Sequence, residues 1–410
     1  MNVECYKLGD LCSITSSKRI FAHQYVSKGI PFYRSKEIIE KSEKKEISEP
    51  LYISEDVYNE IKDKFGVPQK GDMLLTSVGT LGIPYVVDDE KFYFKDGNLT
   101  WFKKFSEQLN SKYLYYWLKS KFGYDSLIAR AIGASQGALT IDILKKYKVL
   151  IPNIQCQNKI VDILSKYDLL IENNNSKIKN LEDLAKQLYK EWFVHFRFPG
   201  YGNVDFYEGI PTIWKYEKIG DIMTFDRGIS YSSEEIDCDE GLNLINLKNI
   251  QSFGGFRRSG TKKYNGKYKK SQVVKENDLI MGVTDMTQER RTVGSVALIP
   301  DMKGISVISA DLVKVNSDID NVFLYTMFRF GNISKYLSQF GNGANVIHLK
   351  PDTIKNKKIL VPDSDTIKAF TDMIKPIIAQ LNNLNNQNDN LTEQRDLLLP
   401  RLMSGKLELK

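Results

Sequence analysis

Basic side chains alternate with tyrosines between Phe256 and Lys270, where the sequence reads FRRSGTKKYNGKYKK. Lysine and arginine pair with phosphate oxygens, and a loop that carries several of them can follow the backbone of a nucleic acid. The pattern therefore favours a polyanion contact through Arg257, Arg258, Lys262, Lys263 and Lys267. A charged run is also typical of a plain solvated surface, so this second interpretation stays open.

Side chains that can read base edges are Arg, Lys, Asn, Gln and the hydroxyl residues, provided that they stand on loops. The segment from Thr284 to Thr292 (TDMTQERRT) fits this description, and it is longer than its counterpart from Thr76 to Gly82 (TSVGTLG) in the first half of the chain. The candidates in these two segments are Thr284, Gln288, Arg290, Arg291, Ser77 and Thr80. The alternative is an ordinary variable surface loop.

Further candidates occupy equivalent places in the two halves of the chain. The first-half members are Lys18, Arg19, Tyr33, Arg34, Ser35, Lys36, Ser135 and Gln136. The second-half members are Arg227, Ser230, Tyr231, Asn246, Lys248 and Asn345. Gln136 could pair with two atoms of an adenine, whereas its counterpart Val346 cannot. The two halves would therefore differ in what they read at this position.

Signatures of catalysis and of metal binding are missing from the sequence. No two prolines are adjacent, which excludes the Asn/Asp-Pro-Pro-Tyr/Phe loop of amino-methyltransferases, and no G-x-x-x-x-G-K-S/T phosphate loop occurs. The four cysteines form no C-x-x-C pair, and the three histidines are far apart in the sequence. We therefore expect a non-catalytic chain that binds no metal and no cofactor of its own.

Composition places few limits on the partner but several on the class of protein. The 410 residues carry 58 basic and 51 acidic side chains, a net charge of +7, which permits a polyanionic partner without requiring one. The length suggests two to three domains. The N-terminus lacks the pattern of a signal peptide, and the most apolar run, Met73 to Val87, is interrupted by two glycines and a proline. We expect no membrane association and a cytoplasmic location.

The chain contains an internal duplication. Residues Gly133 to Pro152 align without gaps on Gly343 to Pro362, with eight of 20 positions identical at an offset of 210. The blocks KLGDL at Lys7 and KIGDI at Lys218 match as well, near the two starts. The order of the blocks is kept over whole halves, so the sequence predicts two homologous domains.

Each half begins with short runs rich in Tyr, Phe, Val and Ile that are bounded by turn residues, followed by a helical patch. This predicts a mixed α/β fold for both domains. Each half ends in a different pattern, a seven-residue repeat of apolar residues that is typical of a long helix in a coiled coil. The repeat positions are Leu164, Ile171, Asn174, Ile178, Leu181 and Leu188 in the first helix and Ile374, Leu381, Leu384, Asn388, Leu391 and Leu398 in the second.

Two asparagines in the apolar stripes indicate how the helices pair. If Asn174 faces Asn388 in an antiparallel pair, the same register places Leu164 beside Leu398 and satisfies the other apolar positions as well. Each helix alone would expose apolar side chains worth about 1.5–3 kcal/mol each, and the other helix is the nearest cover. The alternative is that each helix packs only on its own domain.

The C-terminus RDLLLPRLMSGKL, from Arg395 to Leu407, closely resembles the ending of the specificity (S) subunits of type I restriction–modification systems. The first-half helix end, EWFVHFRFPG from Glu191 to Gly200, also resembles a boundary found in that family. The resemblance covers the whole chain. It implies target-recognition domain 1 at residues 1–153, a spacer helix at 154–199, target-recognition domain 2 at 200–363 and a second spacer helix at 364–410.

The same resemblance implies the function and the partners. It implies a pseudo-two-fold arrangement in which each recognition domain reads one half of a split target in double-stranded DNA while the antiparallel helices set the gap. It further implies that the helices dock two adenine-N6 methyltransferase (M) subunits, which bring S-adenosylmethionine, and through them restriction and translocation (R) subunits. The presence of an R subunit stays open. The alternative function is an assembly scaffold whose basic lobes are incidental.

The paired asparagines lead to a prediction. Replacing both Asn174 and Asn388 with leucine should raise the melting temperature, because a buried Asn pair fixes register at a cost in stability. Thermal melting curves followed by circular dichroism measure the effect, and a lower melting temperature would contradict the predicted register.

Overall fold

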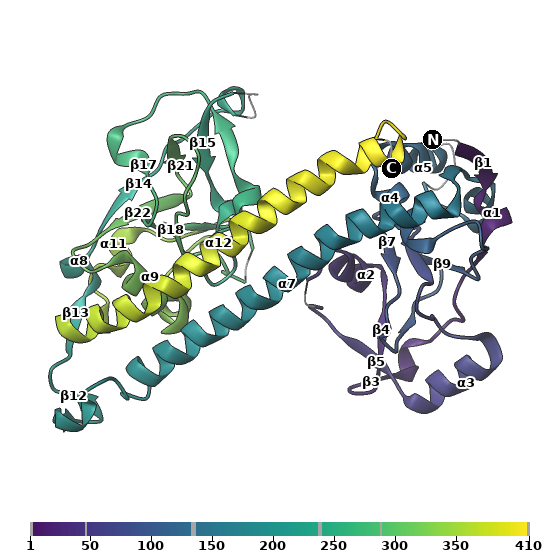
Figure 1. The fold of residues 1–410 in the computed structure, drawn as a ribbon. Helices are drawn as coiled ribbons and strands as arrows, with labels where there is room; N and C mark the ends of the chain where they lie inside the picture. Colours follow the sequence, from purple (N-terminus) through teal and green to yellow (C-terminus); the bar gives the residue numbers. More distant parts are fainter. Residues whose placement is uncertain (1–2, 46, 133–136, 237–239, 288, 408–410) are drawn as a thin grey trace. The chain divides into compact units, whose positions relative to one another are not determined.

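The computed structural model describes residues 3–45, 47–132, 137–236, 240–287 and 289–407. The chain divides into two compact units, which we call unit 1 (Met1–Asn173 with Gln387–Lys410) and unit 2 (Asn174–Asn386). Two helices of 40 residues, α7 (Ile154–Phe193) and α12 (Ser364–Met403), each contribute one part to either unit. Figure 1 draws α7 in blue-green and α12 in yellow.

Unit 1 is a mixed α/β fold built on three sheets. An antiparallel pair joins β1 (Val3–Lys7) to β10 (Lys148–Pro152). One four-stranded sheet has the order β2 (Ser13–Thr15), β9 (Leu99–Lys103), β6 (Met73–Thr76), β7 (Pro84–Val86). The other has the order β3 (Tyr25–Val26), β5 (Leu51–Ile53), β4 (Ile30–Tyr33), β8 (Tyr93–Phe94). The helices are α1 (Leu8–Leu11), α2 (Ser35–Ser42), α3 (Glu55–Phe65), α4 (Ser111–Lys119), α5 (Lys121–Ile132) and α6 (Ile141–Lys146).

Unit 2 repeats this plan with two additional strand pairs. The strand pairs are β13 (Lys215–Lys218) with β24 (Lys358–Val361), β11 (Phe206–Tyr207) with β12 (Ile210–Pro211), and β19 (Thr284–Asp285) with β23 (Ile347–His348). One sheet has the order β14 (Thr224–Arg227), β22 (Leu312–Asn316), β18 (Leu279–Gly282), β20 (Val296–Leu298). The other has the order β16 (Lys262–Tyr264), β15 (Leu242–Ile245), β21 (Ser306–Ile308), β17 (Val273–Val274). The helices are α8 (Ile219–Ile222), α9 (Asn321–Phe330), α10 (Ile333–Ser338) and α11 (Pro351–Ile354).

The repeat extends to matching details of the two units. In both, the second sheet pairs one strand with a parallel neighbour on one side and an antiparallel neighbour on the other: β4 lies between β8 and β5, and β15 lies between β21 and β16. The helices α4 and α9 also begin alike, because Asn110 and Asp320 both accept a backbone N–H bond at the N-cap. The predicted duplication and mixed α/β class are confirmed.

In unit 1, the first part of α7 packs against the last part of α12. Ile160 and Leu164 share one apolar core with Leu402 and Met403, and the guanidinium of Arg395 donates to the carboxylate of Asp168 over 2.7 Å. The predicted register would place Asp168 opposite residue 394, one residue away from the observed partner. The segments therefore run antiparallel within unit 1, close to the register that the sequence predicts.

In unit 2, the last part of α7 packs against the first part of α12 around one aromatic side chain. The ring of Phe370 lies 4.8 Å from that of Phe193, 5.4 Å from that of Trp192 and 6.0 Å from that of Tyr189. The predicted register would place Phe193 opposite residue 369, again one residue away. Because segments of both helices pack together within each unit, the alternative that each helix packs only on its own domain is wrong.

The facing of Asn174 and Asn388 stays a prediction, because these two residues belong to different units. Asn174 is buried on α7, with 7% of its surface exposed. This is consistent with the repeat position that the sequence assigns to it.

The core of unit 1 provides a matched pair of variants. Leu402→Ala should lower the free energy of unfolding of unit 1 by about 2–5 kcal/mol, because Leu402 is fully buried between α12 and α7. Leu397→Ala should change it by about 0.5 kcal/mol or less, because Leu397 is 56% exposed on the same helix. Urea unfolding of both variants measures the difference. Equal losses would show that the end of α12 is not part of this core.

Candidate nucleic-acid interface

The basic stretch predicted from the sequence lies along one edge of the second sheet of unit 2. Strand β16 is the outermost strand of that sheet, and Lys263 on it is exposed, as are Arg257 before it and Lys267 after it. Lys262 is half-buried. Tyr264 turns the other way, is buried, and donates its hydroxyl hydrogen to the backbone oxygen of Lys267 over 2.8 Å. Buried Tyr264 thus fixes the backbone of a loop whose lysine side chains are exposed.

Two buried asparagines attach a second segment to this edge. The amide of Asn246 donates to the backbone oxygen of Gly260 over 2.7 Å, and the amide of Asn249 donates to the backbone oxygen of Arg257 over 2.8 Å. Gly260 lies against the backbone of Lys248, where an added Cβ would come within 2.5 Å of the carbonyl carbon. Lys248, a predicted contact, is exposed and lies beside the basic loop. The sequence did not predict that these two segments are neighbours. We call Lys248, Arg257, Lys263 and Lys267 the basic edge.

Arg258 belongs to a different set of contacts. Its guanidinium donates to the side-chain oxygen of Asn386 on α12 over 2.5 Å and contacts the sulfur of Met302 over 3.4 Å. This arginine connects the loop to the long helix within unit 2, so part of its donor capacity is already used inside the protein.

The loop between β19 and β20 is shaped by a carboxylate that the sequence analysis missed. Asp285 accepts hydrogen bonds from the backbone N–H and the hydroxyl of both Thr287 and Thr292, over 2.7–2.8 Å. Burial alone would raise the pKa of Asp285, but these hydrogen bonds outweigh it and the pKa is lowered. An Asp followed two residues later by Thr is a known turn signal and could have indicated this role.

The cations of that loop differ in how free they are. Arg290 has a backbone φ of 52° and its guanidinium donates to the backbone oxygen of Gln339 over 3.2 Å. Arg291 is exposed and forms an ion pair with Glu289, which is exposed as well. Such a solvated pair contributes little stability, so Arg291 can exchange its partner for a phosphate or a base. Gln288 lies outside the described residues.

The other second-half candidates stand on neighbouring loops. Arg227 and Ser230 are exposed, and Tyr231 is half-buried. Between them, Gly228 lies so close to the backbone of Ser309 that an added Cβ would clash. Asn345 is exposed in the turn that leads into β23. Because β23 pairs with β19, this turn and the loop that carries Arg291 start from the same strand pair.

The first-half candidates are more strongly compensated by local acids. Arg34 pairs with Glu37 and Glu49, and Lys36 pairs with Glu49. The hydrogen bonds that Arg34 donates to Glu37 are the main cause of its raised pKa. Arg19 pairs with Asp96 over 2.8 Å, with 66% of its side chain exposed. In unit 1, nearby carboxylates therefore compete with any polyanion for these cations.

The remaining first-half candidates have fewer competing contacts. The ammonium of Lys18 lies 5.1 Å from the ring centre of Phe65, and the side chain is exposed. Thr80 is exposed, whereas Ser35 is half-buried with its hydroxyl 3.4 Å from the backbone oxygen of Asn98. Ser135 and Gln136 lie outside the described residues.

Four of the predicted contact residues are buried in the structure. Tyr33, Ser77, Asn246 and Thr284 are 3%, 4%, 5% and 5% exposed. The Tyr33 hydroxyl donates to Glu90, and burial together with this carboxylate raises its pKa. The Ser77 hydroxyl is bonded to that of Thr100 over 2.6 Å. Each stands at or just beyond a strand end, where the sequence does not show that the side chain points inward.

Two further features of the described residues concern metal binding and membrane insertion. Within the described part of the chain, no group of three or more His, Cys, Asp or Glu side chains is placed to hold a metal ion. None of the helices in that part is long and apolar enough to cross a membrane.

Comparisons with known proteins agree with the repeat. The family described as type I restriction modification DNA specificity domain matches residues 1–183 and again residues 211–393. The MjaIX type I restriction enzyme specificity subunit of Methanocaldococcus jannaschii is 25% identical over 314 residues, which cover 73% of this chain and 70% of that protein. A protein of Haemophilus influenzae, provisionally named type I restriction enzyme specificity subunit S.HindORF215P, is 36% identical over 157 residues, 38% of this chain and 37% of that protein. The match thus spans just over a third of that relative's length.

One solved structure has the same fold. The type I restriction–modification S subunit from M. genitalium superposes with a TM-score of 0.62 at 14% identity, over 100% of this chain and 97% of that chain.

Proposed function

Because the chain belongs to the type I restriction–modification DNA specificity family, we propose that unit 1 and unit 2 each read one half of a bipartite target in double-stranded DNA. One observation carries this proposal: the DNA specificity domain family matches the chain twice, over residues 1–183 and 211–393. Two copies within a single chain suit a target with two half-sites. The chain itself would be non-catalytic.

Differences between the two units support the reading of two different half-sites. The basic edge of unit 2 presents Lys263 and Lys267 on an exposed strand and loop, whereas Arg34 and Lys36 of unit 1 are paired with glutamates. The loop that carries Arg291 in unit 2 also has a shorter counterpart in unit 1. Two surfaces with different charge and shape would favour different sequences.

The long helices would set the distance between the half-sites. A helix of 40 residues is about 60 Å long, since each residue adds about 1.5 Å, and this exceeds one turn of DNA. A continuous antiparallel pair resists changes in length better than a flexible linker does. The gap in the target would therefore be fixed by helix length.

The outer surfaces of the same helices offer a place for the methyltransferase subunits. Leu169, Leu170 and Leu397 in unit 1 are 61%, 50% and 56% exposed on α7 and α12. Exposed leucines on a helix add apolar area that a partner protein can cover. We infer that two adenine-N6 methyltransferase subunits dock on the helices and bring S-adenosylmethionine, with any restriction subunit joined through them.

The basic edge provides the test of DNA reading. The triple variant Lys248→Gln, Lys263→Gln, Lys267→Gln should weaken binding to the target duplex and lower the slope of log affinity against log salt by up to about 3, because each lost phosphate contact releases about one counterion fewer. Fluorescence anisotropy titrations of the assembled methyltransferase complex at several salt concentrations measure both quantities.

A matched control separates local contacts from net charge. Lys215→Gln, Lys335→Gln, Lys368→Gln removes three exposed lysines elsewhere in unit 2 and should leave the salt slope unchanged. If the two triple variants lose the same slope, the basic edge does not contact DNA. If neither variant binds DNA differently from the parent chain, the scaffold function would be favoured instead.

A further inference from the structure

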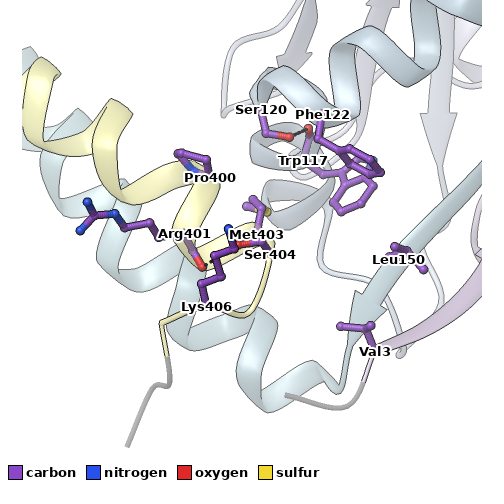
Figure 2. A pocket seen from close by; sticks show the side chains of 10 residues that line it. All are labelled: Val3, Trp117, Ser120, Phe122, Leu150, Pro400, Arg401, Met403, Ser404 and Lys406. Atoms are coloured by element: carbon purple, nitrogen blue, oxygen red, sulfur yellow. Dashed lines mark hydrogen bonds between the residues drawn. The ribbon is translucent and has the colours of Figure 1, made fainter.

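An apolar cavity of about 490 Å³ opens in unit 1 where the end of α12 meets α4 and α5. Its walls are Val3, Trp117, Phe122, Leu150 and Met403, and Figure 2 shows the two aromatic rings on one side and the end of α12 on the other. The rings of Trp117 and Phe122 pack edge to face at 5.5 Å. We call this cavity the unit 1 socket.

The socket exposes more apolar surface than folding requires. Phe122 is 63% exposed, Val3 is 44% exposed and Leu150 is 37% exposed, all around one opening. Grouped exposed apolar side chains around a concavity are typical of a binding site rather than of a plain surface.

The repeat allows the same place in unit 2 to be compared position by position. Val3 pairs with Pro152 across β1 and β10, and the duplication aligns Pro152 with Pro362. Lys215 pairs with Val361 across β13 and β24, so Trp214, the residue before Lys215, lies opposite Pro362 and is the counterpart of Val3. The matching N-caps of α4 and α9 make the start of α10 the counterpart of the start of α5, which carries Phe122.

In unit 2 the corresponding place is filled. Trp214 is only 6% exposed, and its ring lies 5.2 Å from Phe198, 5.3 Å from Phe196 and 5.6 Å from Phe193. Phe196 and Phe198 come from the segment that follows α7. A short segment with aromatic side chains is therefore what covers this surface when the chain itself supplies the cover.

The charge at the opening of the unit 1 socket indicates the rest of the occupant. Arg401 and Lys406 line the cavity, and both are exposed. The residues that line it, all within the described part of the chain, include neither Asp nor Glu. Unpaired cations beside an apolar wall favour a ligand with carboxylates next to its apolar group.

We propose that the unit 1 socket binds a short segment of a partner protein in which aromatic side chains are flanked by Asp or Glu. The aromatic ring occupies the space beside Trp117 and Phe122, and the carboxylates pair with Arg401 and Lys406. This interaction is separate from the proposed DNA reading, because none of the residues that line the socket is a DNA-contact candidate.

A peptide probe tests the proposal on the full-length chain alone. Fluorescein-labelled Asp-Phe-Glu-Phe-Pro-amide should bind saturably, and the same peptide with Lys in place of Asp and Glu should bind at least tenfold more weakly. Phe122→Asn, which removes the exposed ring at the opening, should weaken binding of the acidic peptide at least tenfold. Phe21→Asn removes another exposed phenylalanine of unit 1 and should leave binding unchanged.

Melting curves show that each variant is folded. The proposal is overturned if the acidic peptide does not bind saturably, if Phe122→Asn binds it as well as the parent chain does, or if the acidic and basic peptides bind equally. Concentration-dependent dimerisation that Phe122→Asn abolishes would assign the socket to a second copy of the chain. Tighter peptide binding after truncation at residue 407 would assign it to residues 408–410, and either result would contradict a partner protein.

Discussion

Antiparallel packing between segments of α7 and α12 is the interaction on which the rest of the structure depends. Within unit 1 it buries Leu164 with Leu402, and within unit 2 it surrounds Phe370 with the aromatic end of α7. Neither helix could be stable alone in water, because its apolar stripe would be exposed. Each unit therefore needs residues from distant parts of the chain: unit 1 is completed by the second part of α12.

The duplication explains why one frame can support two different surfaces. The sheets and helix caps are repeated because they hold the core, whereas the loops have diverged. Asn249 and Asp285 illustrate how unit 2 positions such loops. Both are buried, and each is hydrogen-bonded to the backbone of a loop that carries exposed cations. Aromatic side chains from the segment after α7 pack on Trp214 in unit 2, whereas Phe122 at the unit 1 socket is 63% exposed.

The sequence predicted the features that depend on periodicity and repetition. The heptads placed Asp168 and Phe193 within one residue of their observed partners, and the duplicated blocks identified two mixed α/β domains. The sequence could not predict which way a side chain points at the end of a short strand. Tyr33 and Asn246 were therefore misplaced at the surface, although both are buried and hydrogen-bonded. Nor could it show that Arg34 and Lys36 share a glutamate from a different segment.

The central claim is that two DNA-reading units are held at a distance set by the length of the paired helices. Sequencing of methylated adenines in cells that carry the methyltransferase and a chain lacking residues 175–181 and 381–387 tests it most directly. Removing one heptad from each helix keeps the predicted register and shortens the pair by about 10 Å, or about three base pairs. The account predicts that both half-sites are unchanged and that the gap between them is about three base pairs shorter than for the parent chain. Methylation by the shortened chain with the parent's gap, or a single uninterrupted motif for the parent chain, would contradict it.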